Sequence, residues 1–204
     1  MASEQNSKHL PADERRTVTV EAVVALAAQQ NPTDITTAAI AQHMGLTQGA
    51  IFRHFPTKES IVQSVLDWVS EKLMTRVDQA ARTQHSPMAA LEAVFMAHIG
   101  FIAEHPGAPR MLLAELQKSG DTMQKRMVVT LIANYRGRIT EILDRGKTCG
   151  EVVPDLDVDA ASTLYVGMIQ GLVMHSMARS EPVDLLKSAS KTFAVFKRGL
   201  VCTN

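Results

Sequence analysis

Residues 35–55 read ITTAAIAQHMGLTQGAIFRHF, and this stretch decides how the N-terminal part of the chain folds. Two short helical patterns, near residues 37–44 and 48–54, are separated by little more than Gly45 and Leu46. Glycine tolerates a positive φ in a tight turn, and Ala41 is small at the position where two such helices would touch. The spacing therefore predicts a helix-turn-helix.

The second helix of this pair should present a polar outer face. The apolar residues are spaced to face a common core: Ile40, Met44, Leu46, Ile51 and Phe55. A glutamine can bond adenine through two hydrogen bonds, so Gln48 is expected to read a base in the major groove. Gly49 lets the backbone approach DNA closely, and Lys58, at the start of the next helix, is expected to meet a phosphate.

The motif TxxxIAxxxGLTxGxIFRHFxxKExI resembles the DNA-binding domain of the TetR family of bacterial transcriptional regulators. The resemblance covers about residues 15–66. It implies a homodimeric repressor that binds a pseudo-palindromic operator on double-stranded DNA and is released by a small-molecule effector. The residues expected at the DNA are Thr36, Thr47, Gln48, Gly49, Ala50, Phe52, Arg53, His54 and Lys58.

Two positions depart from the family pattern. The family usually has a tyrosine that bonds a phosphate where this chain has Phe52, so one hydrogen bond of about 1 kcal/mol should be missing. Ala38 stands where a basic or polar residue often contacts DNA, so specificity should depend on the helix that begins at Gln48. Arg15 and Arg16 could reach the DNA backbone as an arm, and a solvated pair is an equally good interpretation.

The composition fits a folded protein of one or two domains. The chain has 204 residues, 46% of them hydrophobic, and 21 basic side chains balance 21 acidic ones. Overall charge therefore gives no argument for nucleic acid or an anionic membrane. The segment 1–60 holds five basic and six acidic side chains, so any attraction to phosphate must come from the placement of individual residues.

Apolar residues recur at intervals of three and four along almost the whole chain, which predicts an all-α fold of about nine helices. The first helix should cover about residues 13–30, and a helix of about 25 residues should begin behind Thr57. We expect a DNA-binding domain at residues 1–57 and an effector-binding and dimerisation domain at 58–204. A polar start and the lack of an 18-residue apolar run favour a cytoplasmic protein without a membrane segment.

Two apolar helical patterns near residues 157–178 and 182–199 should pair with a second copy as a four-helix bundle. The candidate interface residues are Leu164, Met168, Leu172, Leu186 and Phe193, for which a place in the chain's own core is the alternative. The resemblance implies an effector cavity within residues 61–180. Its candidate polar lining is His98, Glu115, Tyr135, Tyr165, Gln170 and His175, and ordinary core or surface polarity is the alternative for each.

Other chemistries have weaker support in the sequence. His98 and His175 lack a further ligand at metal-binding spacing, and Asp155, Asp157 and Asp159 lack the rest of a calcium loop, so we expect no metal. No cofactor fingerprint or catalytic motif occurs, so we expect neither a cofactor nor an enzyme. A DNA-organising protein without an effector is the main alternative function. Cys149 could be a redox sensor, although an unreactive loop thiol is the simpler interpretation.

Overall fold

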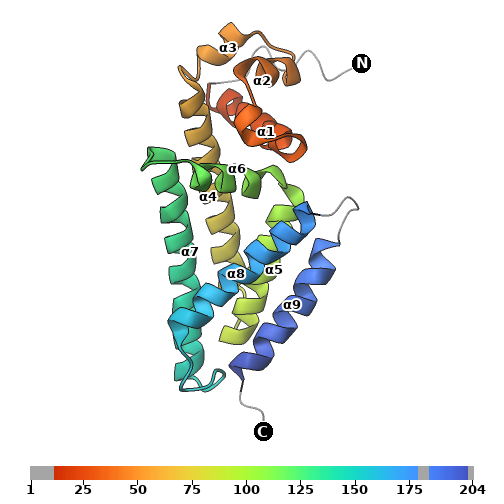
Figure 1. Cartoon of the computed structure of the whole chain (residues 1–204). Coiled ribbons are helices and arrows are strands. Elements are labelled where there is room, and N and C mark those ends of the chain that lie inside the picture. Colours follow the sequence, from red (N-terminus) through yellow and green to blue (C-terminus); the bar gives the residue numbers. More distant parts are fainter. Residues whose placement is uncertain (1–11, 179–183, 202–204) are drawn as a thin grey trace. The chain divides into compact units, whose positions relative to one another are not determined.

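The computed structural model describes residues 12–178 and 184–201 of the chain (Figure 1). The described residues form nine α-helices and a short 3-10 helix, without a strand, which confirms the predicted all-α class. The helices are α1 (Ala12–Gln29), η2 (Pro32–Asp34), α2 (Thr37–His43), α3 (Gln48–Phe52), α4 (Lys58–Arg82), α5 (Pro87–Glu104), α6 (Gly107–Gln117), α7 (Met123–Thr148), α8 (Val158–Met177) and α9 (Leu185–Leu200).

The described helices divide between two compact units that do not follow the chain in simple order. Unit 1 consists of Met1–Glu71 and His105–Val129, and unit 2 of Lys72–Glu104 and Thr130–Asn204. Helices α4 and α7 contribute residues to both units. The helix-turn-helix therefore shares its packing unit with α6, which lies far from it in sequence.

In unit 1, helix α6 packs unusually close to α1. A Cβ atom at Gly107 would collide with the carbonyl oxygen of Val24 and lie 2.8 Å from the backbone nitrogen of Ala28. Only glycine allows this approach, because the obstacle is backbone rather than a flexible side chain. Next to it, a guanidinium nitrogen of Arg110 donates to the carbonyl of Ala28 at 2.8 Å, near the C-terminal end of α1.

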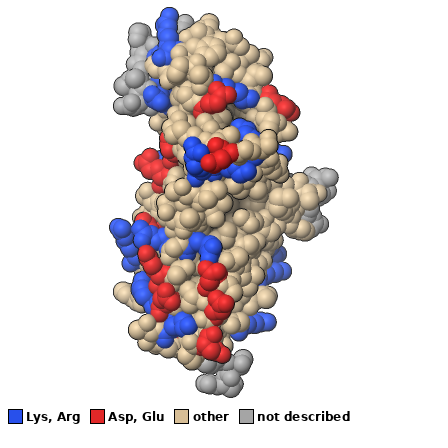
Figure 2. Space-filling view, turned by 60° about the vertical axis from the view of Figure 1, so that its left-hand side comes forward, with Lys and Arg blue, Asp and Glu red and all other residues tan. Residues whose placement is uncertain are grey.

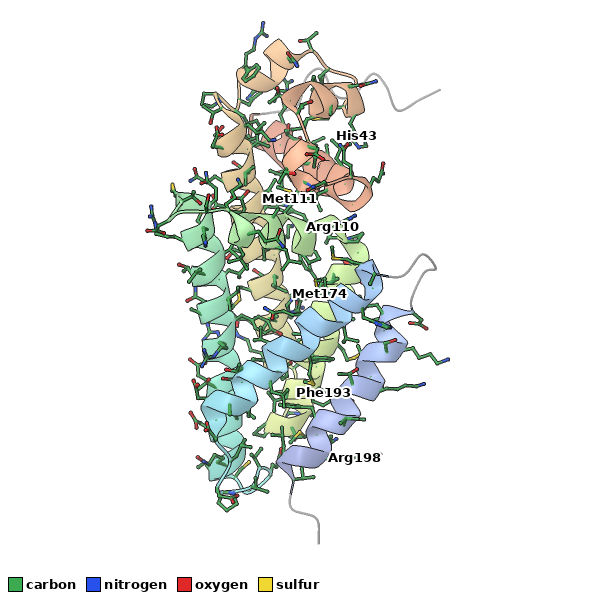
Figure 3. The ribbon with its side chains drawn as sticks, in the orientation of Figure 1. His43, Arg110, Met111, Met174, Phe193 and Arg198 are labelled. Atoms are coloured by element: carbon green, nitrogen blue, oxygen red, sulfur yellow. The ribbon has the colours of Figure 1, made fainter. Side chains whose placement is uncertain are left out.

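In unit 2, aromatic rings from α5, α8 and α9 form the centre of the core. The Phe95 ring lies 5.4 Å from that of Tyr165 and 5.5 Å from that of Phe193. The Tyr165 hydroxyl donates to the carbonyl of Leu91 at 2.7 Å, which satisfies a polar group that would otherwise be costly to bury. Phe193 lies on the side of α9 that faces α5 and α8 (Figure 3).

Helix α5 is the most apolar helix described, and by length and composition it could cross a membrane. Half of its 18 residues are buried inside the protein, including Leu91, Val94, Phe95 and Ile99. Its start is capped from a distance, since the Glu151 carboxylate accepts from the Ser86 hydroxyl at 2.6 Å and from the Met88 N–H at 2.9 Å. These hydrogen bonds lower the pKa of Glu151. The burial and the cap of α5 are those of a core helix.

Candidate nucleic-acid interface

The turn between α2 and α3 has the geometry that the sequence predicted. Gly45 adopts a φ of 65°, and the Leu46 N–H reaches back to the Ala41 carbonyl at 2.8 Å. Ile40, Ala41 and Ile51 are buried, whereas Met44 and Leu46 are only half-buried. The apolar side of the motif thus packs on the rest of unit 1, and the opposite side of α3 is left at the surface.

The two threonines of the interface begin the two helices. The Thr36 hydroxyl accepts from the Ala39 N–H at 3.1 Å, and the Thr47 hydroxyl accepts from the Ala50 N–H at 3.3 Å. Both side chains are exposed. A hydroxyl that accepts as a cap keeps its own O–H for donation, so each threonine can cap its helix and still reach a phosphate or a base.

The remaining residues of α3 and the two residues that follow it differ in exposure. Gln48, Gly49 and Arg53 are exposed, and Phe52 is 45% exposed, although it is an aromatic residue. Ala50 and His54 are half-buried. The structure therefore places most of the residues predicted at the DNA on α3 and directly beside it, with Gln48 and Arg53 among the exposed hydrogen-bonding groups.

Lys58 starts α4 beside a reciprocal cap. The Ser60 N–H donates to the Thr57 hydroxyl at 3.1 Å, and the Thr57 N–H donates to the Ser60 hydroxyl at 3.3 Å. The Lys58 ammonium donates to the Thr33 carbonyl at 3.0 Å. To bind a DNA phosphate, the Lys58 ammonium must leave the Thr33 carbonyl or donate to both groups at once.

The two arginines before the helix-turn-helix are not a free arm. The Arg16 guanidinium lies 5.2 Å from the centre of the Phe55 ring, and a guanidinium nitrogen of Arg15 lies 3.5 Å from the ring nitrogen Nε2 of His54. Both contacts join α1 to the residues after α3. On the face shown in Figure 2, basic and acidic side chains are interspersed rather than gathered into one basic surface.

Of the six candidate effector residues, the structure brings three together in unit 2. The His98 and Tyr135 rings lie 4.9 Å apart, and the Tyr135 and Tyr165 rings 6.4 Å apart. Burial lowers the pKa of His98 to about 3 and raises the pKa of both phenols. The Nδ1 atom of His98 is buried without a hydrogen-bond partner among the described residues, whereas the Tyr135 hydroxyl has Tyr165 as a hydrogen-bonding neighbour.

The other three candidate effector residues do not join this cluster, and their part in an effector lining stays a prediction. Glu115 is buried on α6 in unit 1, and Gln170 and His175 are exposed on α8. The helical pattern places a residue on an apolar segment. It does not reveal which unit that segment joins, nor which side of the helix stays at the surface.

The candidate dimer-interface residues on α8 and α9 differ in how far they are buried. Leu164 is 57% exposed and Leu186 is 46% exposed, with Met168 and Leu172 half-buried. Phe193 is 1% exposed, so the alternative of a core residue was right for it, because it packs on Phe95 and Phe196. A shallow groove of about 610 Å³ between α8 and α9 is lined mainly by apolar residues, including Leu164, Val195 and Phe196. Three further exposed large apolar residues on α8 and α9, which the helical pattern did not single out, are Met174, Met177 and Val195.

The sequence features with weaker support have ordinary structural roles. The Asp157 carboxylate caps α8 by accepting from the Ala160 N–H at 3.0 Å. Cys149 is an exposed free thiol, and the ammonium of neighbouring Lys147 donates to the Leu156 carbonyl. The second cysteine, Cys202, and Pro182, at the predicted start of the last helix, lie outside the described residues. No group of three or more potential metal ligands occurs within residues 12–178 and 184–201.

A capped helix pair with a polar face, attached to a helical unit with an apolar groove, defines a helix-turn-helix regulator. Two family models match the chain, "Bacterial regulatory proteins, tetR family" over residues 20–65 and "YsiA-like protein, C-terminal region" over residues 69–199. The chain belongs to the TetR family of bacterial regulatory proteins. The resemblance inferred from residues 36–61 is thereby confirmed.

Individual relatives are distant in sequence. The nucleoid occlusion factor SlmA of Marinomonas sp. (strain MWYL1) is 25% identical over 170 residues, which cover 83% of this chain and 85% of that protein. The ketosteroid transcriptional regulator KstR2 of Mycobacterium tuberculosis has a TM-score of 0.79 at 22% identity, covering 93% of this chain and 96% of that one. The regulator FadR from Bacillus subtilis, solved with stearoyl-CoA, has a TM-score of 0.78 at 20% identity, covering 90% and 98%. These structures share the fold.

Proposed function

We propose that this protein is a homodimeric transcriptional repressor that binds a pseudo-palindromic operator and is released by a small-molecule effector. The observation that carries the proposal is the exposed face of α3, where Gln48 and Arg53 project from a helix fixed by buried Ile51. This arrangement suits a recognition helix in the major groove. Apart from Lys58, the residues that act on DNA lie within 1–57, and those for effector and partner lie mainly within 58–204.

The apolar exposure of α8 and α9 supports dimerisation. Leu164, Leu186 and Val195 are each at least 46% exposed in a single chain. Two copies that pair along these helices would bury such residues, as helices of a four-helix bundle do. Pairing also supplies two recognition helices for two half-sites, which a palindromic operator requires.

The buried polar groups of unit 2 support an effector with an apolar body and a few polar atoms. His98 offers a ring nitrogen without a partner among the described residues, next to the Tyr135 hydroxyl and inside a largely apolar core. One structural neighbour was solved with stearoyl-CoA, and another is a ketosteroid regulator. An effector that prefers the DNA-free arrangement would release the operator with a coupling of about 1 to 3 kcal/mol.

Matched alanine variants test the role of α3. Gln48→Ala should reduce discrimination at one operator position by about 1 to 3 kcal/mol, because only that base loses its partner. Lys58→Ala should weaken all duplexes alike and lower the salt dependence by about one counterion per half-site. The measurement is fluorescence anisotropy on operator half-sites selected from random DNA, at several salt concentrations. A Gln48→Ala effect that is equal on matched and mismatched duplexes would refute base reading.

The second candidate is a DNA-organising protein of the same fold without an effector, and the 25% identity to a nucleoid occlusion factor favours it. The two differ in their response to small molecules. A thermal-shift series with stearoyl-CoA and steroid probes, followed by operator release, should give a stabilising ligand that also dissociates DNA if the repressor proposal holds. Stable DNA binding that no probe disturbs favours the organising role, and turnover of a probe would instead indicate an enzyme. A cytoplasmic location is part of the proposal for either role.

A further inference from the structure

Unit 1 contains a small pocket of about 170 Å³, and none of the roles above uses its apolar lining. Its walls come from η2, the start of α4, helix α6 and the start of α7. Apolar atoms of Val62, Met111 and Ala114 form one part of the lining, and Glu115 adds a carboxylate. Figure 3 shows Met111 on α6, the helix that carries three of these four residues.

One oxygen of the Glu115 carboxylate lacks a hydrogen-bond donor. Its side chain is only 5% exposed, and one oxygen accepts from the Lys118 ammonium at 2.7 Å. The other oxygen, Oε2, is buried without a hydrogen-bond partner among the described residues. A buried charged oxygen without a donor is unusual in a folded protein and costs free energy, so this oxygen calls for a donor that enters the pocket.

The side-chain ammonium and amide donors around the pocket already have partners. The Lys58 ammonium donates to the Thr33 carbonyl at 3.0 Å, and the Gln124 amide donates to the Glu59 carbonyl at 3.4 Å. The Lys118 ammonium is held by the first oxygen of Glu115. The group that remains without a partner is therefore an anionic acceptor, which selects a ligand with a cationic hydrogen-bond donor.

The size and lining of the pocket limit the rest of the ligand. A volume of about 170 Å³ is smaller than the roughly 300 Å³ at which drug-sized ligand sites begin, so only a short chain fits. The apolar side chains of Val62 and Met111 suit methylene groups, which gain free energy when they leave water.

We propose that this pocket binds a small primary alkylammonium ion, with its ammonium donating to the Glu115 carboxylate and its alkyl chain against Val62, Met111 and Ala114. The site lies in the unit that holds the helix-turn-helix and is separate from the effector residues of unit 2. It does not depend on the proposed operator or effector.

The test is isothermal titration calorimetry of the full-length protein, without DNA, using n-butylammonium chloride at constant ionic strength. Saturable binding to one site per chain is expected, with n-butanol at least tenfold weaker because it lacks the charge. Glu115→Gln, which removes the charge and keeps the shape, should weaken n-butylammonium binding at least tenfold. Ala114→Leu should weaken it as much by filling the pocket without changing any charge.

Glu141→Gln is the matched control, because it removes a carboxylate from an exposed ion pair with Arg138 in unit 2. It should bind n-butylammonium like the unmodified protein. Circular dichroism verifies that each variant is folded, and Ala114→Leu keeps the test decisive if Glu115→Gln is not. No saturable binding, equal binding of n-butanol, or an unchanged affinity in Ala114→Leu would overturn the proposal. A protein that binds n-butylammonium and ignores all DNA would refute the repressor and leave this site standing.

Discussion

The exposed residues of α3 and those of α8 and α9 differ in kind. On α3 they include Gln48 and Arg53, whose hydrogen-bonding groups are satisfied by water until a base or phosphate replaces it. On α8 and α9 they include Leu164 and Val195, which gain free energy only when another apolar surface covers them. A polar surface is stable in water without its partner, whereas an apolar surface favours a permanent partner that covers it. The contrast supports DNA binding by one face and dimerisation by the other.

The largest expected effect tests the packing that holds α3 in place. Gly107→Ala should destabilise unit 1 by about 3 kcal/mol, because the new Cβ would meet the backbone of α1. Gly137→Ala is the control, since a Cβ at Gly137, inside α7, meets nothing within 4 Å and should stabilise the helix by up to about 1 kcal/mol. Urea unfolding measures both free energies, and equal effects of the two variants would contradict the close-packing account.

A charge in the apolar groove tests the other side of the comparison. Val195, which is 69% exposed, lines that groove, and Val195→Glu should place an unpaired carboxylate in the dimer interface. We expect the dimer dissociation constant to rise about 100-fold, equivalent to about 2.7 kcal/mol. Light scattering over a dilution series measures this. Val129→Glu, at a residue 53% exposed on α7, should leave the dimer intact, and the same loss in both variants would argue against an α8–α9 interface.

Acid should affect unit 2 through His98. Burial holds its pKa at about 3 against an ordinary value of 6.5, so the folded chain keeps it neutral while the unfolded chain gains a proton below pH 6.5. Stability is therefore full above pH 6.5 and falls as the pH drops towards 3, by about 1 to 2 kcal/mol at pH 5. His98→Gln should remove this part of the pH dependence in urea unfolding, and the exposed His43→Gln should not. An unchanged slope in His98→Gln would show that another group titrates.

The smallest expected effect concerns the phenyl ring on α3. Phe52→Tyr restores the hydroxyl that the family pattern leads us to expect at a DNA phosphate, and Phe52 is exposed enough to place it there. Operator affinity should increase by about 1 kcal/mol, roughly fivefold, at low salt. The same duplexes and anisotropy assay used for Gln48→Ala measure it. A loss of affinity would indicate that the bare ring itself packs against the DNA.

The sequence predicted local structure well and long-range packing poorly. The turn at Gly45 and the start of α4 behind Thr57 follow from rules that act over a few residues. The place of Glu115 in unit 1 and the burial of Phe193 depend on which helices meet, which periodicity does not encode. The close approach of Gly107 to α1 likewise joins residues about 80 positions apart and has no local pattern.

The discontinuous make-up of unit 1 has a consequence for synthesis on the ribosome. When residue 71 has left the exit tunnel, the helix-turn-helix is present, but the helix that covers α1 has not yet emerged. The nascent chain must keep the apolar side of α1 shielded until α6 emerges, more than 30 residues later. The unit that holds the helix-turn-helix therefore cannot complete its packing before α6 emerges. We expect nascent chains stalled before α6 to be captured by chaperones and to be sensitive to protease.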